Sequence, residues 1–280
     1  MSILVTGAGG QLGKELAHLE VRPGMRMIGL GRSELDITSL EQCRAAMEAH
    51  RPDAVIHCAA YTAVDKAESD ADEAYRINAM GTRNVALAAS ACGAKLCYVS
   101  TDYVFDGKGG RPYEVEDQTN PQTVYGQTKL AGEQEVRALV ESYFIVRTSW
   151  VYGPYGANFV KTILKLAGER DRLAVVSDQI GSPTYTLDLA EFLVRLVQTA
   201  DYGVYHASNT GSCSWHEFAE AIVQEAGLTK VTVDPCSTAE FPRPAARPAY
   251  SVMSHAAIER ARLEDLRPWR DALRAYLRRA

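Results

Sequence analysis

The stretch VYGQTK, residues 124–129, places a tyrosine and a lysine four positions apart. Residues at this separation lie on the same face of a helix, so the side chains of Tyr125 and Lys129 would lie together. A tyrosine hydroxyl can donate a proton to the oxygen of a ketone that accepts hydride, although its usual pKa of about 10 is high for exchange near neutrality. A nearby ammonium group favours the tyrosinate and would lower the pKa of Tyr125. The spacing alone is equally typical of an ordinary amphipathic helix.

A second hydroxyl group comes from Thr101, in the segment CYVSTDYVFDG that ends an apolar strand pattern. In a doubly wound sheet, ligands bind at the carboxyl ends of the strands, which is where Thr101 and Asp102 would lie. Thr101 could donate to the same carbonyl oxygen and fix its position. We therefore predict Tyr125, Lys129 and Thr101 as the catalytic residues of a reductase. Gly126, which has no side chain beside Tyr125, is expected to leave room for cofactor or substrate.

A hydride donor is indicated by TGAGGQLG, residues 6–13, which lies between the first strand pattern and the first helical pattern. A dinucleotide requires a tight turn, close approach of the backbone to its pyrophosphate, and a helix N-terminus that faces negative charge. Gly7 could form the turn, Gly10 could leave room for the phosphates, and Gly13 could let the helix pack on the strand. A lone glycine pattern is weak evidence, but this context favours a dinucleotide site.

The end of the second strand pattern indicates which nicotinamide cofactor binds. An acidic residue there would bind the ribose 2′-OH of NAD, whereas an arginine accommodates the 2′-phosphate of NADP. The segment MIGLGRSELD places Arg32 at this point. We therefore predict NADPH, with NADH as an alternative, and a plain surface charge as the other interpretation of Arg32.

The elements that must position these residues follow a regular order. Short apolar runs alternate with helical patterns over the first half of the chain, which favours a parallel sheet covered on both faces. The runs lie at 2–6, 26–30, 54–58, 95–100 and 144–148. We predict an α/β fold, a Rossmann-type doubly wound sheet with a smaller C-terminal α/β substrate-binding lobe. The predicted division is 1–152 for the dinucleotide-binding domain and 153–280 for the lobe, with an approximate boundary and segments that could interleave.

Composition excludes several other classes. A net charge of −5 over 280 residues gives no reason to expect nucleic acid or an anionic membrane surface as partner. No apolar run approaches the roughly 18–20 residues of a membrane-spanning helix, and the N-terminus lacks a leader pattern, so Met1 is expected to begin the mature chain. The six cysteines are scattered without a CxxC pair, which predicts a cytoplasmic protein and no zinc site.

Taken together, the motifs resemble the dTDP-4-dehydrorhamnose reductase family, in the extended branch of the short-chain dehydrogenase/reductase superfamily. The resemblance rests on TGAGGQLG, AAYTAVDKAE, STDYVFDG, VYGQTKLAGE, RTSWVYG, NFVKT and DQIGSPT and covers nearly the whole chain. It implies NAD(P)H-dependent reduction of the 4-keto group of dTDP-4-dehydro-β-L-rhamnose, the last step of dTDP-L-rhamnose synthesis, with Tyr125 as the acid. Two alternatives stay open: reduction of another 4-keto nucleotide sugar, and a non-catalytic NADP-binding subunit like the regulatory subunit of methionine adenosyltransferase.

The resemblance also implies which residues contact the ligands. The cofactor set is Gly7, Gly10, Gln11, Leu12, Arg32, Asp36, Ile37, Ala60, Tyr61, Thr62, Tyr125 and Lys129. The substrate set is Thr101, Asp102, Trp150 and Arg247, with Arg243 as a second candidate for the diphosphate and Val64 and Val104 as either pocket or core residues. A homodimer is a further expectation. Some family members bind Mg²⁺ at a dimer interface through glutamates, so Glu15 is a candidate, although we expect it to be a solvated helix residue and predict no metal at the active site.

Overall fold

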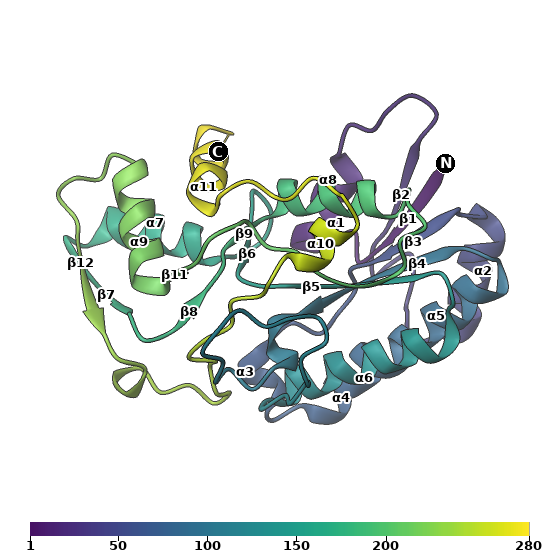
Figure 1. Cartoon of the computed structure of the whole chain (residues 1–280), viewed down its shortest axis with the longest axis horizontal. Helices are drawn as coiled ribbons and strands as arrows, with labels where there is room; N and C mark the ends of the chain where they lie inside the picture. The colour runs from purple at the N-terminus through teal and green to yellow at the C-terminus, as the bar shows by residue number, and fades with distance from the viewer. Residues whose placement is uncertain (280) are drawn as a thin grey trace.

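The computed structural model describes residues 1–279, and its main layer is a six-stranded parallel sheet (Figure 1). The strand order is β10-β5-β4-β3-β1-β2, with all neighbouring strands parallel. The bounds are β1 (Ser2–Thr6), β2 (Arg26–Leu30), β3 (Ala54–His57), β4 (Lys95–Thr101), β5 (Tyr143–Thr148) and β10 (Gly203–His206). The strand order reverses between β1 and β3, because β2 is added on one side of β1 and the later strands on the other. A doubly wound sheet binds its ligands at this point. The five predicted strands are confirmed, and β10 adds a sixth.

Helices cover both faces of this sheet. On one face α1 (Gln11–His18) packs against α8 (Thr186–Leu196), and on the other lie α2 (Leu40–His50), α5 (Thr82–Ala91) and α6 (Val124–Leu139) (Figure 1). Alternate residues of β1 therefore enter different cores: Ile3 and Val5 pack with α1, whereas Leu4 packs with α2 and α5. Burial on both faces explains why the strands are continuous apolar runs in the sequence.

The sequence has a helical pattern over residues 68–92, and the structure divides this stretch into several shorter elements. It comprises α4 (Ala71–Tyr75), a π-helical segment (Arg76–Gly81) and α5, and the short α3 (Val64–Ala67) precedes it. π-Helical segments occur frequently at functional sites. Arg76 and Ile77 of this segment line the large cavity described below.

A smaller body packs beside the sheet and has its own apolar core. It contains α7 (Phe159–Glu169), α9 (Trp215–Glu225) and α11 (Trp269–Arg279), with the parallel pair β7 (Arg172–Val176) and β12 (Thr232–Cys236) (Figure 1). Short paired strands join the two bodies: β6 (Val151–Tyr152) with β9 (Thr184–Tyr185), and β8 (Ile180–Gly181) with β11 (Cys213–Ser214). Because α8, β10 and α10 (Ala256–Arg260) pack in the core of the larger body, segments beyond residue 152 interleave with it.

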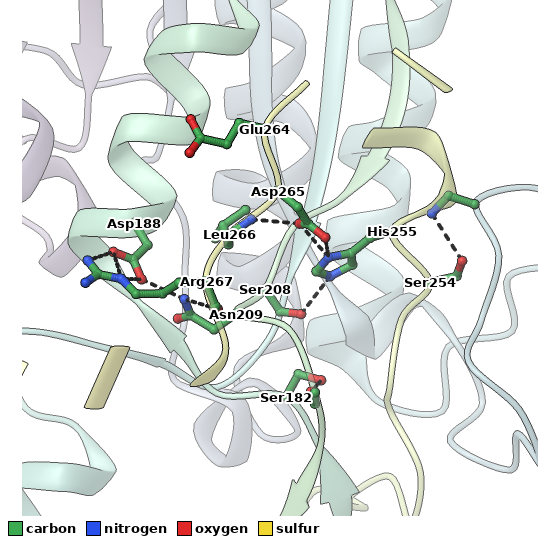
Figure 2. Close-up of polar contacts among 12 residues, drawn as sticks. Ser182, Asp188, Ser208, Asn209, Ser254, His255, Glu264, Asp265, Leu266 and Arg267 are labelled. Carbon is green, nitrogen blue, oxygen red and sulfur yellow. Dashed lines mark hydrogen bonds and ion pairs between the residues drawn. The ribbon is translucent and has the colours of Figure 1, made fainter. Parts of the chain in front are cut away.

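Figure 2 shows how polar contacts fasten the segment between α10 and α11. The Nδ1–H of His255 donates to the Asp265 carboxylate at 2.8 Å, and its Nε2 forms a hydrogen bond with the Ser208 hydroxyl at 3.1 Å. Arg267 pairs with the buried Asp188, which also accepts from Asn209 at 2.6 Å. Ser208 is 1% exposed and lies outside the lining of the large cavity, so the Ser–His–Asp arrangement fastens the chain and does not form a nucleophilic site.

Candidate active site

A cavity of about 980 Å³ extends from the glycine loop, across the carboxyl ends of the central strands, to the smaller body. Its lining brings together most of the residues that the sequence predicts to contact ligands. These are Gly7, Gly10, Gln11, Leu12, Arg32, Asp36, Ile37, Ala60, Thr62, Val64, Thr101, Asp102, Tyr125, Lys129, Trp150, Arg243 and Arg247. Residues from seven segments of the sequence thus face one space that is large enough for a dinucleotide together with a second ligand.

The glycine loop fits a pyrophosphate. Gly7 has a φ of +68°, and a Cβ there would lie 2.6 Å from the backbone nitrogen of Ala59. A Cβ on Gly13 would lie 2.2 Å from the carbonyl oxygen of Gly7. Gly10 caps α1 with no side-chain hydrogen bond, which leaves the first-turn N–H groups free to face a negatively charged ligand.

Two arginines line the end of the cavity beyond β2. Arg32 was predicted there, and Arg76 from the π-helical segment was missed because nothing in its sequence context distinguishes it from a surface charge. Arg76 donates to the Thr38 hydroxyl at 2.7 Å and pairs with Glu73 at 2.6 Å. Hydrogen bonds from Thr38 lower the pKa of Asp36, so this end of the cavity holds an ionised carboxylate beside two cations.

Tyr61 is placed differently from its neighbours. Its hydroxyl donates to Asp70 at 3.0 Å and its backbone N–H donates to Asn78 at 2.8 Å. Ala60 and Thr62 line the cavity, whereas the lining does not include Tyr61. The contact between Tyr61 and the cofactor stays a prediction. In the structure the Tyr61 side chain forms a hydrogen bond with Asp70, the residue that precedes α4.

Tyr125, the residue that we predict to donate the proton, lies in the first turn of α6. Burial raises the pKa of the Tyr125 hydroxyl to about 12, and the Thr101 hydroxyl opposes part of this rise. Lys129 is 2% exposed, and its ammonium donates to the carbonyl of Val99 at 2.8 Å. Burial lowers the pKa of Lys129 to about 7, against the attraction of the Glu133 carboxylate. Burial and the nearby Asp102 carboxylate thus raise the pKa of Tyr125, in place of the lowering by Lys129 that the spacing of the two residues predicts.

Gly126 has a different role from the one that we predicted. A Cβ on Gly126 would lie 2.2 Å from the carbonyl oxygen of Tyr103 and 3.0 Å from Pro121. The absence of a side chain makes room for the 3₁₀ turn Asp102–Val104, which follows β4, and not for cofactor or substrate. The close approach of Gly126 to Tyr103 packs the start of α6 directly against the turn that carries Asp102.

The opposite end of the cavity is aromatic. Trp150 has a φ of +48°, and its ring stacks on Trp215 with centroids 3.5 Å apart and planes at 9°. A Cβ on Gly181 would lie 2.6 Å from the Trp150 ring, so this glycine makes room for the indole. A left-handed backbone at a bulky residue is strained and persists only where surrounding contacts enforce it. Trp215, which the sequence reasoning missed, forms a second aromatic wall.

Charged groups complete the substrate end. Arg247 pairs with Asp65 at 2.8 Å, and Arg243 lies on the same exposed, proline-rich loop. Asp102 accepts from the Thr101 hydroxyl at 3.0 Å, and burial raises its pKa to about 6. Within residues 1–279 the other carboxylate oxygen of Asp102 is buried without a hydrogen bond, and the Ser251 hydroxyl near Asp102 opposes part of the rise in its pKa. Of the two valines, Val64 lines the cavity and Val104 is fully buried in the core.

Glu15 is not the solvated residue that we expected. It is 2% exposed, accepts from the Thr186 hydroxyl at 2.9 Å and pairs with Arg279 at 3.2 Å. In the part of the chain that the structure describes, no group of three or more His, Cys, Asp or Glu residues could hold a metal ion. Glu15 therefore joins α1 to the C-terminal helix.

Comparison with known proteins agrees with this geometry. Residues 1–280 match the model of the family described as RmlD substrate binding domain. The chain belongs to this family. It is 47% identical to the spore coat polysaccharide biosynthesis protein SpsK of Bacillus subtilis, over 98% of this chain and 96% of that protein. It is 46% identical to dTDP-4-dehydrorhamnose reductase of Streptomyces griseus, over 96% of this chain and 91% of that protein.

Solved structures of the same family superpose closely. The crystal structure of dTDP-4-dehydrorhamnose reductase from Bacillus anthracis in complex with NADP has a TM-score of 0.95 and 47% identity, covering 100% of this chain and 99% of that chain. Because the match extends over both bodies, this family member has the whole fold of its relatives and not only the dinucleotide-binding part.

Proposed function

We propose that the chain is a dTDP-4-dehydrorhamnose reductase, which reduces the 4-keto group of dTDP-4-dehydro-β-L-rhamnose to give dTDP-L-rhamnose. The observation that carries the proposal is that Thr101, Tyr125 and Lys129 line the same cavity as the glycine loop. The full-length similarity to proteins of that name supports the same reaction.

NAD(P)H, when bound, supplies the hydride that reduces the ketone carbon. The glycine loop and the N-terminus of α1 would hold its pyrophosphate, with Ala60, Thr62 and Lys129 along the path to the substrate. The ketone oxygen then gains a proton from the Tyr125 hydroxyl, which leaves a tyrosinate. The Lys129 ammonium stabilises the negative charge of the tyrosinate, and the Thr101 hydroxyl holds the substrate's ketone oxygen in place by a hydrogen bond. Hydride and proton together convert the carbonyl to an alcohol.

The substrate roles are also proposals. Trp150 and Trp215 form an apolar surface for the deoxysugar ring. Arg247 and Arg243 supply cations for the diphosphate, since a guanidinium matches phosphate geometry. Asp102 lines the cavity beside Thr101, and we propose that its carboxylate accepts a hydrogen bond from a sugar hydroxyl.

NADPH is the preferred cofactor in this proposal. Arg32 and Arg76 lie together at the end of the cavity where the adenosine ribose would bind, and they suit a 2′-phosphate. The complex of the Bacillus anthracis relative contains NADP. NADH use stays an alternative.

Other expectations stay predictions of the same proposal: the division near residue 152, a homodimer, and a cytoplasmic location. All six cysteines are free thiols, which suits a reducing compartment. Within residues 1–279, no helix combines the length and apolar character that a membrane crossing requires.

The experiment is NADPH oxidation against a panel of dTDP-linked and other 4-keto nucleotide sugars, followed by identification of the product. We expect the highest kcat/KM with dTDP-4-dehydrorhamnose. Turnover of another 4-keto nucleotide sugar, without turnover of dTDP-4-dehydrorhamnose, would show that the chain is a reductase with a different substrate. NADPH binding with no turnover on any member of the panel would favour the non-catalytic alternative.

A further inference from the structure

A buried ion pair lies one helical turn behind Lys129. Glu133 is 0% exposed and Arg147 is 1% exposed. The guanidinium of Arg147 donates from Nε to Oε1 of Glu133 at 2.9 Å and from Nη2 to Oε2 at 2.8 Å, which is the two-point geometry of a strong pair. The Ser100 hydroxyl donates to the same Oε1 at 2.6 Å. The carboxylate is therefore held by three hydrogen bonds away from water.

The three residues come from the three elements that build the proton-delivery site. Ser100 precedes Thr101 at the end of β4, Arg147 lies near the end of β5, and Glu133 lies on α6 four positions after Lys129. The pair thus clamps the catalytic helix to the strand ends at the depth where Thr101 and Lys129 lie.

The rest of the environment keeps Arg147 in place. The ring of Phe105 lies 5.0 Å from its guanidinium carbon, and the Nε2 of the buried His206 lies 3.4 Å from its Nη1. Burying two charges is expensive, and well-packed apolar residues in their place often give equal or greater stability. Stability alone therefore gives a weak reason for an ion pair at this position.

The groups that face Lys129 indicate what the carboxylate does. From α6 comes Glu133, from β4 the ring of Tyr98 at 4.0 Å and the Val99 carbonyl, and from the end of β3 the side chains of His57 and Cys58. Burial lowers the pKa of His57 to about 3 and raises the pKa of Cys58 to about 12, so both are neutral at pH 7. Among these groups, Glu133 is the one that offers a carboxylate to the ammonium.

We infer that Glu133 is a positioning residue of the proton-delivery site: clamped by Arg147 and Ser100, it fixes the turn of α6 that carries Lys129 and holds that lysine in its charged form. The inference rests on the proposed function, because it assigns a purpose to the charge of Lys129 during reduction. Glu133 acts through Lys129 and does not touch the substrate.

The first test is Glu133→Gln, which keeps the size of the side chain and removes its charge. Lys129 should then lose its proton at lower pH, so the fall of kcat on the alkaline side should begin about one pH unit earlier. One unit corresponds to about a 10-fold loss of the charged lysine above its pKa. We expect kcat to fall about 10-fold at pH 8.5 and much less at pH 6, with KM for the sugar nearly unchanged. A wild-type pH profile in the folded variant would overturn the inference.

The matched control is Glu135→Gln on the same helix. Glu135 pairs with Arg83 at 2.9 Å, but both side chains are partly exposed. This variant loses an ion pair of the same type from α6 without changing the charge near Lys129, so its pH profile should match that of the wild type. A shift equal to that of Glu133→Gln would show that any loss of charge from α6 suffices, and would overturn the inference.

A second variant covers the case in which Glu133→Gln does not fold. Replacing both partners, Glu133→Met with Arg147→Met, removes the pair without leaving an unpaired buried charge. Because Lys129 still loses its carboxylate, the alkaline limb should shift in the same direction. The single variant Glu133→Asp keeps a carboxylate at this position. The fall of its kcat on the alkaline side should therefore lie closer to that of the wild type than the fall in Glu133→Gln does. A folded double variant with the wild-type profile would contradict the role.

A readout without turnover separates this inference from the proposed function. The ammonium of Lys129 can be titrated by NMR with ¹³Cε-labelled lysine, assigned by its loss in Lys129→Met. Glu133→Gln should lower that titration midpoint, even if the wild-type protein reduces no 4-keto sugar and the proposed function fails. If the wild-type enzyme turns over and the Lys129 midpoint in Glu133→Gln equals that of the wild type, the inference is overturned and the proposed function stays intact.

Discussion

Replacing Gly126 with alanine should damage catalysis more than folding. The new Cβ would lie 2.2 Å from the Tyr103 carbonyl oxygen, more than 1 Å inside ordinary contact at 3.4 Å. Because that neighbour is backbone, the start of α6 or the turn after β4 must shift. Overpacking of this kind costs about 1–3 kcal/mol, and the better helix propensity of alanine returns about 1 kcal/mol. We expect a net loss of about 0–2 kcal/mol in the free energy of unfolding.

The effect on rate should be larger, because Gly126 is adjacent to Tyr125. Misplacing a reacting group by about 1 Å can lower the rate about 100-fold. The assay is kcat at saturating NADPH and sugar, with urea unfolding of the same samples. The control is Gly168→Ala in α7, where a Cβ meets nothing within 4 Å. It should keep wild-type kcat and gain up to about 1 kcal/mol. A Gly126→Ala enzyme with wild-type kcat would refute the idea that this contact positions the tyrosine.

Two further predictions concern the cofactor and pH. Arg32→Ala should raise the KM for NADPH more than that for NADH, because only NADPH carries the 2′-phosphate; equal changes would show that Arg32 does not contact it. Folding stability should fall as pH drops from about 6.5, because unfolded histidine binds a proton there whereas burial lowers the pKa of His57 and of His206 to about 3 in the fold. Asp102, whose pKa is raised to about 6, gains a proton in the fold and offsets part of that loss. Urea midpoints at pH 7.5 and 5.5 measure the balance, and a higher midpoint at pH 5.5 would contradict it.

The fold was largely predictable because its signals are local. Apolar strands buried on both faces, a glycine loop between strand and helix, and Tyr125 and Lys129 on one helix face each depend on neighbours in sequence. The assignment of β10 to the main sheet was not predictable in this way, since its partner β5 lies about sixty residues earlier in the chain.

The missed residues share a similar cause. Arg76 and Trp215 line the cavity through tertiary contacts, and nothing in their own segments marks them. Glu133 and Arg147 lie in the motifs VYGQTKLAGE and RTSWVYG, but the sequence does not show that the two side chains form an ion pair. Gly126 was misread because sequence shows only that a side chain is absent, not whether a ligand or the backbone of Tyr103 fills the space. Glu15 has the sequence context of a surface helix residue, and its burial depends on Arg279 at the other end of the chain.

The most direct test of the account is the reduction of dTDP-4-dehydrorhamnose by wild-type enzyme and by Tyr125→Phe at saturating NADPH. The variant lacks the proton donor but keeps the ring, so NADPH binding measured by fluorescence should be unchanged. We predict that the wild type forms dTDP-L-rhamnose and that kcat of the variant falls about 100- to 10,000-fold, the usual contribution of proton transfer by a positioned side chain. An undiminished rate in Tyr125→Phe would contradict the account.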